Sequence, residues 1–140
     1  TWLTREERDQ DLADHLRYLD LLLAAAQAGL APGAEFHLLG FSQGAVMAAR
    51  WVGAGAVVPQ HLVLWGIQPP EDTLPALADR MAGREVTLVA GDRDPFAPPG
   101  TLEDLAASLA RHGVRARVER FDGGHSLSKE VLRRLATGPA

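Results

Sequence analysis

Apolar residues recur along the chain with a period that changes from block to block. Leucines between Thr4 and Ala26 are spaced three and four apart, which predicts an amphipathic helix beginning at a Thr4–Glu7 capping box. The run Glu35–Phe41 is a short, mainly apolar run of the kind that a parallel sheet buries on both faces. The pattern therefore begins with a helix followed by a strand.

The alternation continues to the carboxyl end of the chain. Further helices are predicted at 45–52, 74–81, 101–112 and 127–135, with strands at 61–65, 85–90 and 115–121. Repeated strand–helix units with short loops favour the α/β class, a doubly wound and mostly parallel sheet with helices on both faces. Ligands of such sheets bind beyond the carboxyl ends of the strands, so functional residues are expected in the loops there.

Composition narrows the classes of protein that the chain can belong to. With 140 residues and 46% hydrophobic content, residues 1–140 are expected to form a single domain. The net charge of −4, without blocks of like charge, gives no sign of a nucleic-acid partner. The absence of cysteine excludes disulfides and a thiolate nucleophile. The apolar stretch 21–26 is too short to span a bilayer, and the default expectation is a cytoplasmic protein.

One glycine-flanked serine carries the strongest chemical signal. The motif Gly40-Phe41-Ser42-Gln43-Gly44 falls between a predicted strand and a predicted helix, as a nucleophile elbow requires. We expect the serine to adopt a strained backbone conformation, with glycines on either side because larger side chains would collide with the strand and helix. The alternative is an ordinary serine helix cap.

A serine nucleophile needs a base to take its proton and an acid to orient that base. Asp92 and Asp94 follow the strand at 85–90, and His125 follows the strand at 115–121 after two glycines. This order along the chain is the one expected on such a fold. Asp94 is favoured because it lies deeper in its loop and precedes Pro95, which holds it extended; Asp92 fits a turn residue.

The remaining histidines have ordinary structural explanations. They lie within predicted helices or strands or at their ends, and none belongs to a cluster with metal-ligand spacing: His15, His37, His61 and His112. His125 is therefore the candidate base, and no metal site is expected.

These motifs together resemble a known family. Gly-Phe-Ser-Gln-Gly-Ala, Gly-Asp-x-Asp-Pro and Gly-Gly-His-Ser, each after a strand, are similar to those of the phospholipase/carboxylesterase family of the α/β-hydrolase superfamily, which includes acyl-protein thioesterases. The resemblance covers nearly the whole chain, and Gln43 is its most discriminating residue. It implies hydrolysis of small acyl esters or thioesters by the nucleophile Ser42, the base His125 and the orienting acid Asp94. It also implies that the backbone N–H of Gln43 is an oxyanion donor.

The chain departs from the family at two residues and at its beginning. Trp65 precedes a glycine where a small polar residue is usual, and Phe96 replaces a smaller aliphatic residue. Trp65, Phe96 and Leu127 are candidates for the walls of an acyl pocket. The favoured alternative is that each is an ordinary core residue. The family's first strands and its second oxyanion loop have no counterpart before Thr1. We therefore expect a C-terminal, nucleophile-bearing portion of the fold, in which the 35–41 strand has an unpaired edge.

The leading hypothesis is acyl transfer to water through an acyl-enzyme, which requires no cofactor. A non-catalytic binding or scaffold fragment and a serine peptidase on the same fold are the alternatives. The sequence leaves open the acyl length, the leaving group and whether identical chains assemble into an oligomer.

Overall fold

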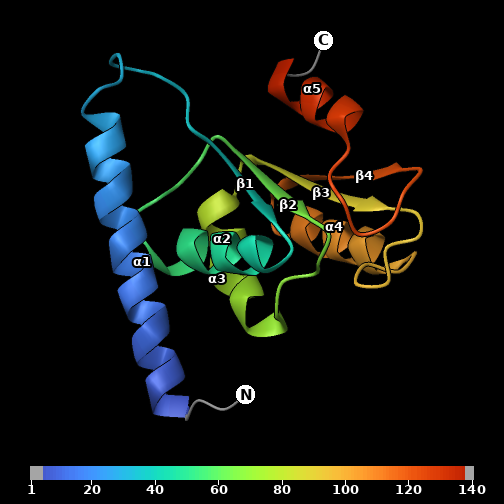
Figure 1. The fold of residues 1–140 in the computed structure, drawn as a ribbon, viewed down its shortest axis with the longest axis horizontal. Coiled ribbons are helices and arrows are strands. Elements are labelled where there is room, and N and C mark those ends of the chain that lie inside the picture. The colour runs from blue at the N-terminus through green and yellow to red at the C-terminus, as the bar shows by residue number, and fades with distance from the viewer. Residues whose placement is uncertain (1–4, 138–140) are drawn as a thin grey trace.

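A computed structural model describes residues 5–137, and side chains from residue 8 onward, as a parallel sheet with helices on both faces (Figure 1). The elements in chain order are α1 (Arg5–Gln27), β1 (His37–Phe41), α2 (Gln43–Ala54), β2 (His61–Trp65), a short 3-10 helix η1 (Glu71–Thr73), α3 (Leu74–Met81), β3 (Glu85–Gly91), α4 (Thr101–Arg111), β4 (Arg115–Phe121) and α5 (Lys129–Thr137).

Every helix and strand predicted from the sequence is present, with small shifts at the ends. β1 begins two residues later than predicted. α5 begins at Lys129 rather than residue 127 because Ser128 acts as its N-cap, its Oγ accepting the N–H of Val131 at 3.3 Å. Thr4, part of the predicted capping box, lies outside the described residues.

The four strands pair in parallel in the order β1-β2-β3-β4. Helices α2, α3 and α4, which connect successive strands, lie on one face of the sheet, while α5 covers the other (Figure 1). β2 is buried along its whole length, but β1 is half exposed, because within residues 5–137 it pairs with β2 alone. The prediction that the 35–41 strand is buried on both faces is therefore wrong for this edge strand.

Two apolar clusters hold the layers together, one on each face of the sheet. The larger lies between the sheet and the three connecting helices. The smaller lies under α5 and consists of Val63, Trp65, Val89, Val131 and Leu135. Because both faces carry apolar side chains on the central strands, β2 and β3 form the rigid middle of the molecule.

Helix α1 packs beside α2 (Figure 1). Leu23 is buried in the larger cluster, and the Asp20 carboxylate accepts the indole N–H of Trp51 at 2.7 Å and the backbone N–H of Ala56 at 3.0 Å. The helix also carries exposed apolar residues, namely Tyr18, Leu21 and Leu22. None of the helices within residues 5–137, α1 included, has the length and apolarity needed to cross a membrane.

Candidate active site

Ser42 lies in the single-residue turn between β1 and α2. Its backbone has φ 56° and ψ −121°, making it the one non-glycine residue with positive φ among residues 5–137. The left-handed region is costly for a residue with a Cβ, and such strain is typical of a nucleophile at a sharp strand-to-helix turn. The Ser42 N–H donates to the Trp65 carbonyl at 2.7 Å, which fastens this turn to the end of β2.

The two flanking glycines of the motif are not equivalent. A Cβ on Gly40 would lie 2.3 Å from the Gly44 carbonyl oxygen and 2.7 Å from Ala45 Cα, so strand and helix can approach only because residue 40 has no side chain. A Cβ on Gly44 would meet nothing within 4 Å. The expected collision is therefore present at Gly40 and absent at Gly44, because Gly44 is exposed in the first turn of α2.

Asp94 lies in the loop that follows β3, and it is 3% exposed. Its Oδ1 accepts the backbone N–H of Phe96 at 2.9 Å, which leaves Oδ2 directed at His125. Asp92 is exposed. Its backbone N–H donates to the Phe121 carbonyl at 2.9 Å and so joins the loop after β3 to the end of β4. Of these two aspartates, Asp94 is the one whose carboxylate contacts His125. Asp94 also accepts the N–H two residues further on, which is the hydrogen bond typical of a turn that was expected of Asp92.

His125 completes a continuous chain of hydrogen bonds. Its Nδ1 lies 2.9 Å from Asp94 Oδ2, and its Nε2 lies 2.9 Å from Ser42 Oγ. Because a carboxylate only accepts hydrogen bonds, the Nδ1 atom must carry a proton, which makes Nε2 of the neutral ring the acceptor of the serine hydroxyl proton. Three residues predicted from separate loops are thereby brought together at the carboxyl edge of the sheet.

The imidazole of His125 is held between two phenylalanine rings. Phe41 stacks on it with ring centroids 5.0 Å apart, and Phe96 lies 4.8 Å away at a tilt of 52°. Beneath it, a Cβ on Gly66 would lie 3.0 Å from the imidazole Cε1 atom, so the glycine after β2 lets the ring approach the sheet. These contacts restrict the ring to the plane in which both of its nitrogens are hydrogen bonded.

The backbone N–H of Gln43 is the first of α2, directly after Ser42. Amide groups in the first turn of a helix have no acceptor within the helix and point along the positive end of its dipole. This N–H is therefore suitably placed for an anion that forms beside the serine.

Arg120 of β4 supports the loop that carries Asp94 (the acid loop), a role that was not predicted from the sequence. Its guanidinium donates to the carbonyl oxygens of Ala97 at 3.0 Å and Pro98 at 3.1 Å, and it pairs with Glu103 at 2.9 Å. The hydrogen bond from Arg120 lowers the pKa of the Glu103 carboxyl group below its ordinary value. No spacing in the sequence links these residues, since the contacts arise only when β4 lies beside the loop after β3.

The three candidate pocket walls have different surroundings. Trp65 is completely buried, as the plain-core alternative expected, whereas Phe96 is 59% exposed and Leu127 48% exposed. Both exposed side chains belong to the loops that carry Asp94 and His125. They give this edge of the sheet an apolar rim.

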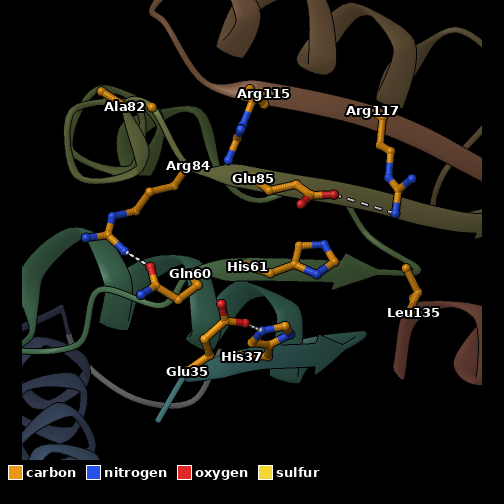
Figure 2. Close-up of a pocket in the computed structure, with 11 residues that line it drawn as sticks. Glu35, His37, Gln60, His61, Ala82, Arg84, Glu85, Arg115, Arg117 and Leu135 are labelled. Carbon is orange, nitrogen blue, oxygen red and sulfur yellow. Dashed lines mark hydrogen bonds and ion pairs between the residues drawn. The ribbon is translucent and has the colours of Figure 1, made fainter. Parts of the chain in front are cut away.

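A hollow of about 630 Å³ lies at the opposite, amino edge of the sheet (Figure 2). The four strands begin there with His37, His61, Glu85 and Arg115 in register. Two pairs of its polar side chains contact one another, His37 Nε2 with Glu35 at 3.2 Å and Arg117 with Glu85 at 3.6 Å. Among the described residues, no group of three histidines or carboxylates could hold a metal ion.

Comparisons with known proteins identify the class of fold. No protein-family model matches the chain, and no curated protein sequence matches it. Among solved structures, it is similar to SOBER1 of Arabidopsis thaliana, with 15% identity, a TM-score of 0.69, and coverage of 90% of this chain and 61% of that chain. It is also similar to esterase PE8, with 28% identity, a TM-score of 0.65, and coverage of 94% and 61%. Acyl-protein thioesterase 2 of Zea mays has 14% identity and a TM-score of 0.67, with coverage of 98% and 68%.

These likenesses, with the parallel sheet and its helices, define an α/β-hydrolase-like fold and confirm the fold class predicted from the sequence. The chain spans about three fifths of the length of the SOBER1 and PE8 chains.

Proposed function

We propose that the chain hydrolyses carboxylic ester or thioester bonds through an acyl-enzyme on Ser42. The observation that carries this proposal is the continuous set of contacts from Ser42 Oγ to His125 Nε2 and from His125 Nδ1 to Asp94, both at 2.9 Å. This is the arrangement that activates a serine hydroxyl, which is otherwise a weak nucleophile. The esterases and the thioesterase among the structural neighbours support the same reaction class.

In the acylation step, Ser42 Oγ attacks the carbonyl carbon of the substrate while His125 Nε2 takes the hydroxyl proton. The resulting tetrahedral oxyanion collapses, the bond to the alcohol or thiol breaks, and the leaving group receives that proton from His125. Water then attacks the acyl-enzyme by the same proton route and releases a carboxylic acid. Asp94 holds the ring in the required tautomer and stabilises the imidazolium.

The Gln43 N–H is the donor that we assign to the oxyanion. One such donor typically contributes about 2.7–4 kcal/mol to transition-state stabilisation. Phe96 and Leu127 form the apolar rim on which the acyl or alcohol portion of the substrate would rest, because apolar surface binds apolar groups without desolvating charge.

Fluorophosphonate labelling followed by intact-mass measurement tests the proposal directly. The wild-type chain should gain one phosphonyl group, and Ser42→Ala should gain none. Ser126→Ala is a matched control, because Ser126 lies next to His125 but offers only its backbone carbonyl to the site. An unlabelled wild-type chain, or labelling that persists in Ser42→Ala, would overturn the assignment.

The choice of substrate bond is tested on a matched pair of compounds. A p-nitrophenyl butyrate and the corresponding p-nitroanilide present the same acyl group as an ester and as an amide. The proposal expects Ser42-dependent release from the ester with little from the anilide. Faster cleavage of the anilide would favour a peptidase, and binding of the ester without turnover would favour a non-catalytic role.

A further inference from the structure

Trp65 makes two hydrogen bonds that end on two different parts of the candidate active site. Its carbonyl oxygen accepts the N–H of Ser42 at 2.7 Å, and its indole N–H donates to the carbonyl of Ser126 at 3.0 Å. Ser42 is the candidate nucleophile, and Ser126 directly follows His125. One residue at the end of β2 therefore fixes the elbow through its main chain and the histidine loop through its side chain.

The indole is itself immobile. Trp65 is fully buried, β2 is hydrogen bonded to a strand on either side, and the ring packs in the cluster with Val89 and Val131 beneath α5. The Phe121 ring lies 5.7 Å from it, centroid to centroid. A ring packed on all sides in a core stays in one rotamer, so its N–H is a fixed point to which the loop can be tied.

The loop that carries His125 needs such a fixed point. Two consecutive glycines, Gly123 and Gly124, precede the histidine, and glycine has the largest conformational freedom to lose on folding. On the amino side of His125, the Gly123 carbonyl is held by the Arg93 N–H at 2.9 Å. On its carboxyl side, the Trp65 indole holds the Ser126 carbonyl. The histidine thus lies between two tethers, one of which is a tryptophan side chain.

We propose that Trp65 is a positioning residue that sets the distance between His125 and Ser42 by tethering both of their segments to β2. The inference rests on the proposed function, since that distance matters for proton transfer from the Ser42 hydroxyl. Without the indole N–H, the loop retains its glycine freedom and the imidazole spends less time within hydrogen-bond reach of Oγ. A displacement of about 1 Å in such a site can cost about 10²-fold in rate.

Trp65→Phe removes the indole N–H, and Trp51→Phe is its matched control. Trp51 is also a buried tryptophan, but its indole N–H donates to Asp20 of α1 at 2.7 Å and not to a segment of the candidate site. Both variants lose one indole hydrogen bond and part of a core ring. Replacing Trp65 by benzothienylalanine, which keeps the ring shape and lacks the N–H, separates the hydrogen bond from the packing.

The first readout measures kcat and KM separately for a short p-nitrophenyl ester. The temperature is one at which circular dichroism shows every variant to be folded. Trp65→Phe and the benzothienyl variant should lose about 10-fold to 10²-fold in kcat with KM nearly unchanged. Trp51→Phe should keep the wild-type kcat. Equal kcat values in wild type and in the benzothienyl variant would overturn the proposal.

The second readout does not depend on turnover. The Nδ1 proton of His125, shared with Asp94, should give a far-downfield NMR signal in wild type and in Trp51→Phe. That signal should broaden or disappear in the two Trp65 variants, because the ring then leaves the hydrogen-bonded position. If wild type hydrolyses no ester, the proposed function fails, but this signal still tests whether Trp65 positions His125. An unchanged signal in both Trp65 variants would overturn the positioning role of Trp65.

Discussion

The backbone of Gly40 lies directly against the carbonyl oxygen of Gly44, so a Cβ on Gly40 would stand 2.3 Å from that oxygen. Gly40→Ala must therefore separate β1 from α2 and displace Ser42. We expect a loss of about 1–3 kcal/mol in the free energy of unfolding, as for other overpacked positions, and a large fall in esterase rate. Urea unfolding and p-nitrophenyl ester hydrolysis measure the two effects.

Gly44→Ala is the matched control for Gly40→Ala, since its Cβ would meet no atom within 4 Å. Alanine is also the better helix former by about 1 kcal/mol, so the variant should be as stable as wild type or slightly more stable. Similar losses in both variants would contradict the asymmetric packing of the two glycines.

Asp94→Asn tests the acid that orients His125. An amide at this position can present its NH₂ group to Nδ1 and so favour the wrong tautomer of the imidazole, with little change in shape. If the proposed function holds, kcat should fall by about 10⁴-fold, as when the orienting acid of a serine hydrolase triad is replaced by its amide. Asp92→Asn, in the same loop but exposed, should keep nearly full activity. The reverse ranking of the two variants would assign the role to Asp92.

The candidate triad could be proposed from the sequence because its members lie in loops that share one edge of a parallel sheet. Ser42, Asp94 and His125 each follow a strand, and strand ends can be recognised from apolar runs and glycines. Contacts between side chains distant in the chain could not be predicted in this way. Arg120 reaches Ala97, and the Trp65 indole reaches Ser126, only after the strands are paired.

The solvent exposure of apolar side chains was the other property that could not be predicted from the residue pattern. Phe96 and Leu127 are apolar and follow strands, so nothing in the sequence distinguished core from rim, yet both are about half exposed. Similarly, the 35–41 run has the composition of a buried strand, and its exposure follows from its place at the edge of the described sheet. Such features depend on which neighbour an element has, which composition does not encode.

Arg120→Met should loosen the loop after β3 that carries Asp94. The Arg120 side chain is 17% exposed, and its guanidinium donates to the Ala97 and Pro98 carbonyls. Charged hydrogen bonds of this kind contribute about 1.5–3 kcal/mol. We expect a loss of about that size in the free energy of unfolding together with a lower kcat. Arg93→Met is the control, since its pair with Asp122 at 2.5 Å is solvent exposed and should contribute nothing measurable. Equal effects would show that Arg120 does not support the loop.

Phe96→Ala tests the apolar rim. The ring is 59% exposed, so its removal should leave the free energy of unfolding nearly unchanged while one side of the His125 imidazole opens to water. KM for aryl and medium-chain esters should rise several-fold, and labelling of Ser42 by a small fluorophosphonate should persist. An unchanged KM across an acyl-length series would show that substrates do not rest on this ring.

His61 should make the stability of the protein depend on pH below neutrality. Burial lowers the pKa of His61 below its ordinary value of 6.5; Glu85 opposes this, whereas His37 and Arg117 add to it. The ring is neutral in the fold, with Nε2 2.7 Å from Thr87 Oγ1. Well above pH 6.5, folded and unfolded chains are both neutral at this residue and the stability is fully present. As the pH falls, the unfolded chain binds the proton first, so stability is lost until the folded-state pKa is reached.

His61→Gln removes this titration while keeping a group that can hydrogen bond to Thr87. Between about pH 7.5 and about pH 5.5, wild type should therefore lose more free energy of unfolding in urea than the variant does. Parallel curves for wild type and His61→Gln would show that another group is responsible for the acid sensitivity.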